Sequence, residues 1–364
     1  MRLRKTTAML TFAALGCTLP ATAAFGASPG RPPALPQTGA GPATFAYLCV
    51  KGKSLTPSGT CDTWRVVTAD GVVYSFPEAL AYEKGKDDAG RSGAFAISPD
   101  GLRVAYHRAS DDRVAVRDLG TGETWTMPYK VPRRSVGSPF ELRFAGDGAG
   151  LAITPTDTDP PATVYVRVEE GTARRLPKGW KLIGAEDGRF TLLREPGIGT
   201  RGMFRTIDGG RTADVKIPEK AGKHLIWGAF AARDGRAANL VPTDPPACGP
   251  DMTPVWLASF STATGKMTKV KPRLPADVHH ADVIDWLNAS EIVAAAGRER
   301  PDKEFTATGS YVYAVNVTTG AARLLAKLST RETVHESNLV VGGYLAARGA
   351  AADKAIKPSK DGCG

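Results

Sequence analysis

The stretch AFAISPDGLRVAYHRASDDRVAVRDLGTGE, residues 94–123, decides the fold because it alternates short apolar runs with turn residues. FAIS and RVAYH alternate apolar and polar side chains around Pro99, Asp100 and Gly101. In such a turn, Pro presets one backbone dihedral angle and Gly accepts a positive one. RVAVRDL and the following TWTMP form a second pair around GTGE. The stretch therefore predicts two β-hairpins, and so four short strands, in one unit.

The second hairpin recurs along the chain at intervals of 39 to 55 residues. Its turns are centred on Gly71, Gly122, Gly171, Gly210, Gly265 and Gly320. Weaker copies of the first hairpin turn at Asp147-Gly148, Asp187-Gly188, Asp234-Gly235 and Asn288-Ala289. A repeat of this length, with strands throughout, predicts an all-β chain folded as a β-propeller with four-stranded blades.

The sequence predicts six blades, with seven as the alternative if residues 279–309 contain extra strands. The strands that begin at residue 43 lack a full first hairpin, whereas SNLVVGGYLAAR, residues 337–348, is not followed by a second one. We therefore expect strands from the two ends to share one blade, which would remove exposed sheet edges. Truncation at Ser337 should then unfold the domain.

The repeat at residues 95–123 resembles the WD40-like repeat of TolB-type propellers, which is also seen in the propeller domains of prolyl oligopeptidase relatives. The resemblance implies that ligands bind to the face formed by the blade-to-blade connections and by the loops between second and third strands. We expect no separate domain before the propeller and no hydrolase domain after it. Neither the envelope-complex role nor peptidase chemistry is therefore carried over.

The N-terminal 26 residues have the charged, apolar and small-residue order of a secretory signal, with Arg2, Arg4 and Lys5 before the apolar run. We expect a secreted, extracellular protein, with a lipid anchor on Cys17 as the alternative. The run is about half as long as the ~20 residues of a membrane span, and we expect no transmembrane segment. The formal net charge is +10, but the basic residues do not form one stripe, so we expect no nucleic-acid partner.

The rest of the chain divides into a Pro- and Gly-rich tether over residues 27–42, the propeller over 43–350 and a C-terminal tail over 351–364. The tether has no apolar periodicity, so we expect it to be disordered and its deletion to have little effect. It contains LPQTG, residues 35–39, which matches a cell-wall sorting pattern. Because that pattern normally stands near a C-terminus, we interpret the match as chance.

Four cysteines remain after the signal: Cys49, Cys61, Cys248 and Cys363. An even number in an exported chain predicts two disulfide bonds. Cys49 and Cys61 flank a short polar segment, which favours a local pair between them and a second bond between Cys248 and Cys363. Three pairings are possible on paper.

Long loops between second and third strands are the expected ligand face. The candidate ligand-binding residues on them are Arg108, Asp111, Asp112, Asp157, Asp159, Arg201, Asp244, Asp251 and Arg298. PTDTDPP and PTDPP share a Pro-stiffened template that could hold aspartates outward for a sugar, a cation or a basic peptide. The alternative is that these aspartates bond to their own backbone in Asx-turns.

No catalytic constellation stands out. Residues 277–285, DVHHADVID, contain His279, His280, Asp282 and Asp285, but adjacent histidines on a strand point to opposite faces, so we predict no metal site. Glu141, Asp187 and Asp285 could face the channel as carboxylates for glycoside chemistry, although their spacing selects no pair.

The sequence predicts a monomeric, non-catalytic binding or scaffolding propeller without a cofactor. Its expected partner is a protein, peptide or glycan of the cell envelope. The alternative is a secreted carbohydrate-active hydrolase or lyase with carboxylates at the channel mouth.

Overall fold

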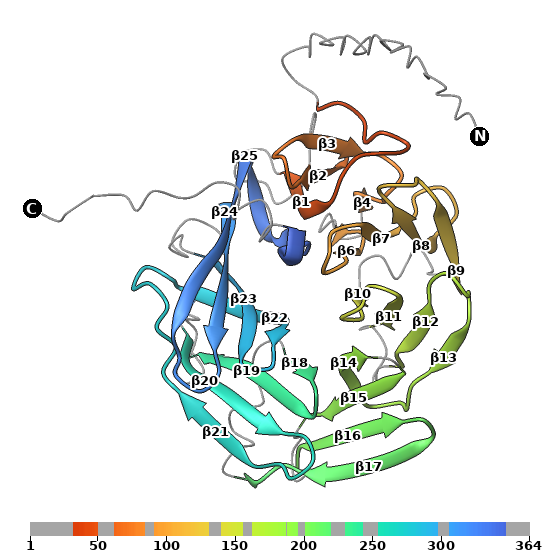
Figure 1. Ribbon diagram of the computed structural model, residues 1–364. Helices are drawn as coiled ribbons and strands as arrows, with labels where there is room; N and C mark the ends of the chain where they lie inside the picture. The colour runs from red at the N-terminus through yellow and green to blue at the C-terminus, as the bar shows by residue number, and fades with distance from the viewer. Residues whose placement is uncertain are drawn as a thin grey trace, which may run out of the picture.

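The computed structural model describes residues 32–49, 62–83, 91–130, 140–155, 162–186, 188–195, 201–219, 230–242, 254–297 and 306–346. Figure 1 looks along the axis of a ring of antiparallel sheets, which the chain visits in sequence order. The sheets form six blades of four strands each. The expectation of six blades is confirmed, and the seven-blade alternative is wrong because residues 280–316 form three strands of a single blade.

Four blades each consist of four consecutive strands. Blade 2 contains β6 (Phe95–Ile97), β7 (Arg103–His107), β8 (Arg113–Asp118) and β9 (Thr124–Lys130). Blade 3 contains β10 (Phe140–Phe144), β11 (Gly150–Pro155), β12 (Val164–Arg167) and β13 (Ala173–Arg175). Blade 4 contains β14 (Lys181–Glu186), β15 (Arg189–Arg194), β16 (Met203–Asp208) and β17 (Arg211–Lys216). Blade 5 contains β18 (Phe230–Arg233), β19 (Arg236–Pro242), β20 (Pro254–Ser261) and β21 (Met267–Val270).

Blades 6 and 1 share one long strand. Blade 6 contains β22 (His280–Asn288), β23 (Glu291–Gly297), β24 (Thr306–Asn316) and the first part of β25 (Ala322–Val341). Blade 1 contains the last part of β25 with β1 (Ala43–Cys49), β2 (Trp64–Thr68) and β3 (Val73–Phe76). A two-stranded ribbon, β4 (Tyr82–Glu83) and β5 (Arg91–Ser92), lies between blades 1 and 2.

The ring is closed by pairing between the two ends of the propeller. Phe45 pairs with Val341, and Tyr47 pairs with Leu339. The C-terminal segment thus supplies the inner strand of the blade begun by the N-terminal strands, as expected from the incomplete hairpins at the two ends. Closure satisfies the backbone groups at the inner edge of β1, which would otherwise be open to another chain.

The turns form where the sequence places Gly. All six glycines predicted for the second hairpins have positive φ, as does Gly101 in the first hairpin of blade 2. Asp100 Oδ1 accepts a hydrogen bond of 3.0 Å from the backbone N–H of Leu102, and Asp147 Oδ1 accepts one of 2.9 Å from Ala149. These aspartates therefore bond to the backbone in Asx-turns.

Apolar side chains fill the space between neighbouring blades. Between blades 1 and 2, the rings of Trp64 and Phe95 stack with centroids 4.7 Å apart, and the ring of Tyr106 meets that of Phe76 edge-on at 4.8 Å. Between blades 5 and 6, the buried indole Nε1 of Trp286 donates to the carbonyl oxygen of Ala231 at 3.0 Å. The core is thus divided among the junctions between neighbouring blades.

Residues 32–42, which we call the N-terminal strap, pack against blades 1 and 2. Ala34 forms a parallel bridge with Ser75 at the outer edge of β3, and Leu35 is buried in the core between blades 1 and 2. Arg117 Nη2 donates to the carbonyl oxygens of Pro36 at 2.7 Å and Gln37 at 2.9 Å. The expectation of a disordered tether is therefore wrong for this part of residues 27–42.

The strap has no apolar periodicity because its attachment to the blades needs none. One leucine and a series of backbone carbonyl groups make most of the contacts. Ser75 donates from its backbone N–H to the carbonyl oxygen of Pro33 at 2.8 Å, and the N–H of Gly39 donates to Gly120 at 2.8 Å. The strap thus covers the otherwise open edge of β3.

The chain crosses toward the axis after β25. In a short turn over residues 342–346, the backbone N–H of Gly343 donates to Ser98 at 3.0 Å, and that of Leu345 donates to Pro99 at 3.0 Å. Figure 1 shows this C-terminal turn in blue near the centre of the ring. It brings Tyr344 to the inner strands of the other blades. In the described part of the chain, no helix is long and apolar enough to cross a membrane.

Candidate ligand-binding site

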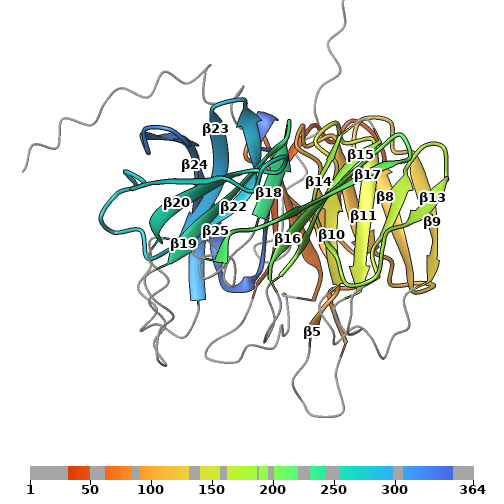
Figure 2. The same ribbon diagram turned by 90° about the horizontal axis from the view of Figure 1, so that it is seen from below.

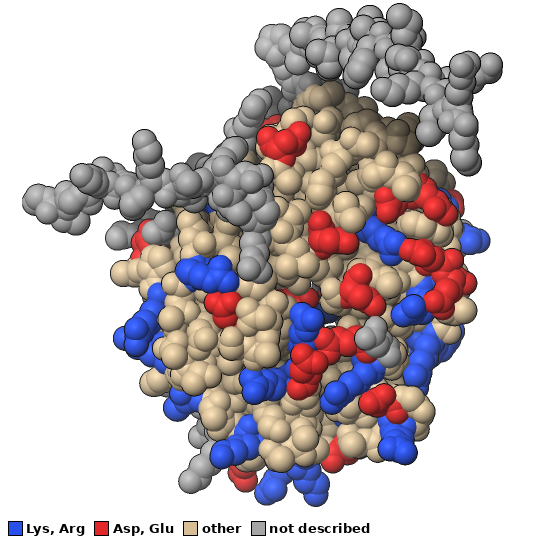
Figure 3. All heavy atoms as spheres, viewed as in Figure 1, with Lys and Arg blue, Asp and Glu red and all other residues tan. Residues whose placement is uncertain are grey.

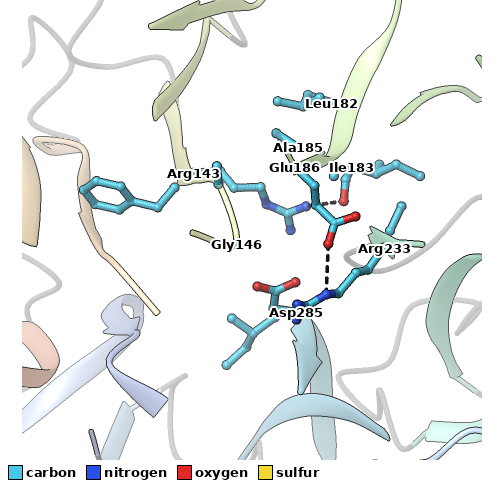
Figure 4. A pocket seen from close by; sticks show the side chains of 13 residues that line it. Arg143, Gly146, Leu182, Ile183, Ala185, Glu186, Arg233 and Asp285 are labelled. Atoms are coloured by element: carbon cyan, nitrogen blue, oxygen red, sulfur yellow. Dashed lines mark hydrogen bonds and ion pairs between the residues drawn. The ribbon is translucent and has the colours of Figure 1, made fainter. Parts of the chain in front are cut away.

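A hollow of about 430 Å³, including its part open to solvent, lies beside the axis where the inner strands of four blades end. We call it the axial hollow. Its charged lining comes from four strands: Arg143 on β10, Glu186 on β14, Arg233 on β18 and Asp285 on β22. Figure 4 shows these four side chains converging from different blades, and Figure 3 shows blue and red atoms intermixed around the centre of the same face.

Arg143 reaches across two blade junctions. Its Nη1 donates to the carbonyl oxygen of Ile183 in blade 4 at 3.1 Å and to that of Phe230 in blade 5 at 2.8 Å. Its Nε lies 3.9 Å from Glu141 Oε1. Two backbone acceptors therefore hold the guanidinium group in place at the wall of the hollow.

Glu186 and Arg233 form an ion pair across the junction of blades 4 and 5. Arg233 Nε lies 2.9 Å from Glu186 Oε1, and Arg233 Nη1 donates to the carbonyl oxygen of Trp286 at 3.3 Å. Glu186 Oε2 also accepts a hydrogen bond of 3.2 Å from the backbone N–H of Asp234. Each member of this pair thus has its opposite charge beside it.

Asp285 is held by two hydrogen bonds. Its Oδ2 accepts the phenol O–H of Tyr344 at 2.7 Å, and its Oδ1 accepts the backbone N–H of Trp286 at 2.7 Å. Burial, and then the negative charge of Asp285, raise the pKa of the Tyr344 phenol above its usual range. The phenol therefore stays a hydrogen-bond donor at neutral pH and fixes the carboxylate at the hollow.

A β-bulge in β22 directs Asp285 to the hollow. The register between β22 and β23 shifts between Val283 and Asp285, and Val283 and Trp286 are both buried in one core cluster. Regular alternation would have put Asp285 on the same face as Val283, inside that core. The extra residue re-aims the carboxylate, as bulges beside binding sites often do.

A second bulge, in β14, brings blades 4 and 5 close together. The register with β15 shifts between Leu182 and Gly184. A Cβ atom added at Gly184 would lie 2.0 Å from the carbonyl oxygen of Ala232, so only glycine permits this approach of the inner strands. The spacing of Glu186 and Arg233 depends on that approach.

The axial hollow does not lie on the face that the resemblance implied. It adjoins the turns between first and second strands, because Gly146, Glu186 and Arg233 directly precede residues of those turns. Neighbouring strands are antiparallel, so the long loops between second and third strands leave from their opposite ends. In Figure 2 the strand β5, on a blade-to-blade connection, lies below the ring, and the C-terminal turn lies above it.

The structure describes four of the nine residues predicted on the long loops. Arg108 and Asp111 bond to each other, with Nε to Oδ1 at 2.8 Å and Nη2 to Oδ2 at 2.5 Å. This bond from Arg108 lowers the pKa of Asp111. Asp112 has a positive φ of 59° and lies 4.0 Å from His107 Nε2, and Arg201 Nη2 lies 3.6 Å from Glu219 Oε2. Arg108 and Asp111 therefore already neutralise each other.

The other predicted long-loop residues, Asp157, Asp159, Asp244, Asp251 and Arg298, lie outside the described residues. The same holds for Asp187 and for three of the cysteines, Cys61, Cys248 and Cys363. Cys49 is buried at the end of β1. The pairing of the cysteines and the role of these loops stay predictions.

The segment with adjacent histidines forms the strand β22. His280 Nε2 lies 3.3 Å from Asp282 Oδ2, whereas Asp285 bonds to Tyr344. Within the described ranges, no three His, Cys, Asp or Glu side chains are grouped so as to hold a metal ion. Glu141 lies 3.9 Å from both Lys181 and Arg143, so its carboxylate has cations beside it.

Only Asp285 among the charged residues of the axial hollow was singled out from the sequence. Glu186 directly precedes the Asp187-Gly188 turn, and Arg233 directly precedes Asp234-Gly235. A charged residue directly before the first turn of a blade could therefore have identified both residues from the sequence. Arg143 and Tyr344 had no comparable signal.

Together, the fold and this hollow define the class of the protein. It is a six-bladed β-propeller, closed by pairing of its N- and C-terminal strands, with a charged site near the axis on the face that carries the turns between first and second strands. No protein-family model matches the chain, and no curated protein matches it. The WD40-like repeat therefore stays a resemblance of one blade.

Solved structures similar to this chain are also propellers or contain them. TolB from Acinetobacter baumannii has 16% identity and a TM-score of 0.38, with 82% of this chain and 66% of that one covered. A prolyl endopeptidase has 14% identity and a TM-score of 0.43, covering 79% of this chain and 43% of that one. A chain of a nidogen/laminin complex has 8% identity and a TM-score of 0.43, covering 83% of this chain and 98% of that one.

Proposed function

We propose that this protein is an exported, non-catalytic β-propeller that binds a polar ligand of the cell envelope at the axial hollow. The observation that carries the proposal is the convergence of Arg143, Glu186, Arg233 and Asp285 from four blades on one solvent-open hollow. Their hydrogen bonds hold them in place before a ligand arrives, which lowers the entropic cost of binding. Export and the envelope location rest on the signal-like N-terminus.

The arrangement favours binding over glycoside hydrolysis. Hydrolysis needs two carboxyl groups facing each other across the scissile bond. Here Glu186 is paired with Arg233, and Asp285 accepts hydrogen bonds from Tyr344 and the backbone of Trp286. Both carboxylates are thus held as fixed hydrogen-bond acceptors, which suits recognition.

The proposal is tested with a panel of muropeptides, tripeptides and oligosaccharides, using isothermal titration calorimetry and mass spectrometry of each mixture. We expect at least one compound to bind, to be recovered unchanged, and to bind at least tenfold more weakly to the Arg233→Gln variant. Arg236→Gln is the control because Arg236 donates to Ala289 at 2.8 Å and does not line the hollow. Cleavage of a compound that is lost in Asp285→Asn would overturn the non-catalytic assignment. Equal binding to Arg233→Gln and the control would overturn the location.

A further inference from the structure

Two opposite charges at the axial hollow are less closely paired than Glu186 and Arg233: Arg143 Nε lies 3.9 Å from Glu141 Oε1, and Asp285 has no ion pair among the described residues. Asp285 has no cationic nitrogen within 4.0 Å among the described residues, and its two printed bonds come from a phenol and a backbone amide. Arg143 uses Nη1 for two carbonyl oxygens, and its Nη2 makes no hydrogen bond within the described part of the chain. Glu186 and Arg233, by contrast, satisfy each other at 2.9 Å.

These two groups are also partly shielded from water. The side chain of Arg143 is 21% exposed, and Asp285 is half-buried. A partly buried charge without a close ion pair is costly, and its cost falls when a ligand supplies a closer opposite charge. Both groups border one hollow, so one ligand can reach them together (Figure 4).

We infer that the axial hollow binds a zwitterion of the α-amino acid type. Its carboxylate accepts hydrogen bonds from Nη2 of Arg143, and its ammonium group donates to the carboxylate of Asp285. This inference rests on the proposed function and names the ligand class for the same site.

The chemistry of both groups suits such a head group. A guanidinium presents its N–H donors in a plane that matches a carboxylate, and an ammonium has three donors for the lone pairs that Asp285 keeps after its two bonds. Ile284, which is half-buried, also lines the hollow and offers an apolar contact to an aliphatic side chain. An α-amino acid carries both charged groups on one carbon atom, so it can present them together to two residues that border the same hollow.

The supports of both groups make the site rigid. Arg143 is fixed by carbonyl groups of two blades, and Asp285 by Tyr344 and by the bulge in β22. A ligand therefore meets charges already positioned, and the binding energy is not used to order them.

The test is calorimetric titration of the purified protein with glycine, L-alanine, L-leucine and L-glutamine. Acetate and methylammonium serve as half-ligands, and trialanine serves as a ligand with separated charges. We expect at least one amino acid to bind at least tenfold more tightly than either half-ligand and than trialanine. Asp285→Asn keeps an acceptor for Tyr344 but removes the charge, and it should weaken that binding at least tenfold.

Asp234→Asn is the matched control, because it makes the same charge change at a residue that is beside the ion pair but does not line the hollow. Arg143→Lys is the second variant; it keeps a donor for the backbone carbonyl groups and loses the planar fork, so it should also weaken binding. Amino-acid binding that is equal in Asp285→Asn and Asp234→Asn overturns the inference. If trialanine binds more tightly than every amino acid tested, the assignment of an α-amino-acid head group is wrong.

The two proposals fail in different ways. If no amino acid binds while a muropeptide or oligosaccharide binds in an Arg233-dependent way, the zwitterion inference is wrong and the proposed function stands. If nothing in either panel binds, both are wrong.

Discussion

Arg117 on β8 donates a hydrogen bond of 2.7 Å to the carbonyl oxygen of Pro36, 81 residues earlier in the chain. The same guanidinium group bonds to Glu78 Oε1 at 2.8 Å, and the Arg117 side chain is 2% exposed. A buried arginine thus joins the N-terminal strap, the end of blade 1 and blade 2. The strap is part of the folded ring.

Deleting residues 32–42 should therefore destabilise the propeller. Removal of the strap exposes the pocket of Leu35 and leaves Arg117 without two acceptors, and we expect the free energy of unfolding to fall by about 3–5 kcal/mol. Arg117→Met should lower it by about 2–4 kcal/mol. Urea denaturation monitored by tryptophan fluorescence measures both changes.

Gln37→Ala is the control for the strap, because Arg117 bonds to the backbone oxygen of Gln37 and its side chain is exposed. It should change the stability by less than about 0.5 kcal/mol. Equal stabilities of the deletion variant and the full mature chain would show that the strap does not contribute.

Removing the closing strand should unfold the ring. A chain that ends at Ser337 lacks Leu339, Val340 and Val341 and leaves the inner edge of β1 unpaired. We expect loss of the cooperative thermal transition in far-UV circular dichroism. A chain that ends at Ala346 keeps the strand and Tyr344 and should melt within a few degrees of the full chain. Both truncations remove Cys363, the predicted partner of Cys248, so both carry Cys248→Ser and the full chain used for comparison carries Cys248→Ser and Cys363→Ser. Similar melting of the two would contradict closure by β25.

Gly184→Ala should disturb the junction of blades 4 and 5. Its Cβ would lie 2.0 Å from the carbonyl oxygen of Ala232, so the inner strands must separate, at a cost of about 1–3 kcal/mol. Gly146→Ala is the control, because nothing lies within 4 Å of its Cβ position and its φ is not positive. Both glycines line the axial hollow. Thermal melts that do not distinguish the two variants would exclude a tight approach at Gly184.

The cysteine pairing remains a prediction. We expect Cys49 to be joined to Cys61, since that bond closes a short loop after β1 and contributes about 3 kcal/mol in the chain-entropy model. Peptide mapping of the exported protein without reduction should recover the linked peptides. A peptide that joins Cys49 to Cys363 would refute the pairing.

The long-loop face remains an alternative location for the ligand. If it binds there, replacing Asp157, Asp159 and Asp244 with Asn should weaken binding, while each change costs under ~0.5 kcal/mol of stability. If the axial hollow is the site, the triple variant should bind normally and Asp285→Asn should not. Calorimetry with the same ligand on both variants separates the two faces.

The sequence alone was sufficient for the architecture because a propeller is specified locally. Gly71 and Gly320 adopt the positive φ that their turns require, and the period of the hairpins sets the number of blades. Closure by residues 339–341 also followed from the sequence, because an incomplete blade at each end must be completed by the other. These features depend on turn chemistry and alternation over short stretches.

Tertiary structure alone decided the strap and the axial hollow. Pro36 and Gln37 bind Arg117 through backbone oxygens, which every residue has. No pattern of side chains in the sequence could therefore predict this attachment. Asp285 reaches the hollow through a bulge that breaks the alternation on which sequence reasoning relies. Arg143 and Asp285 come from different blades and become neighbours only when the ring closes, because the distance between them is set by how the blades pack and not by any stretch of the chain.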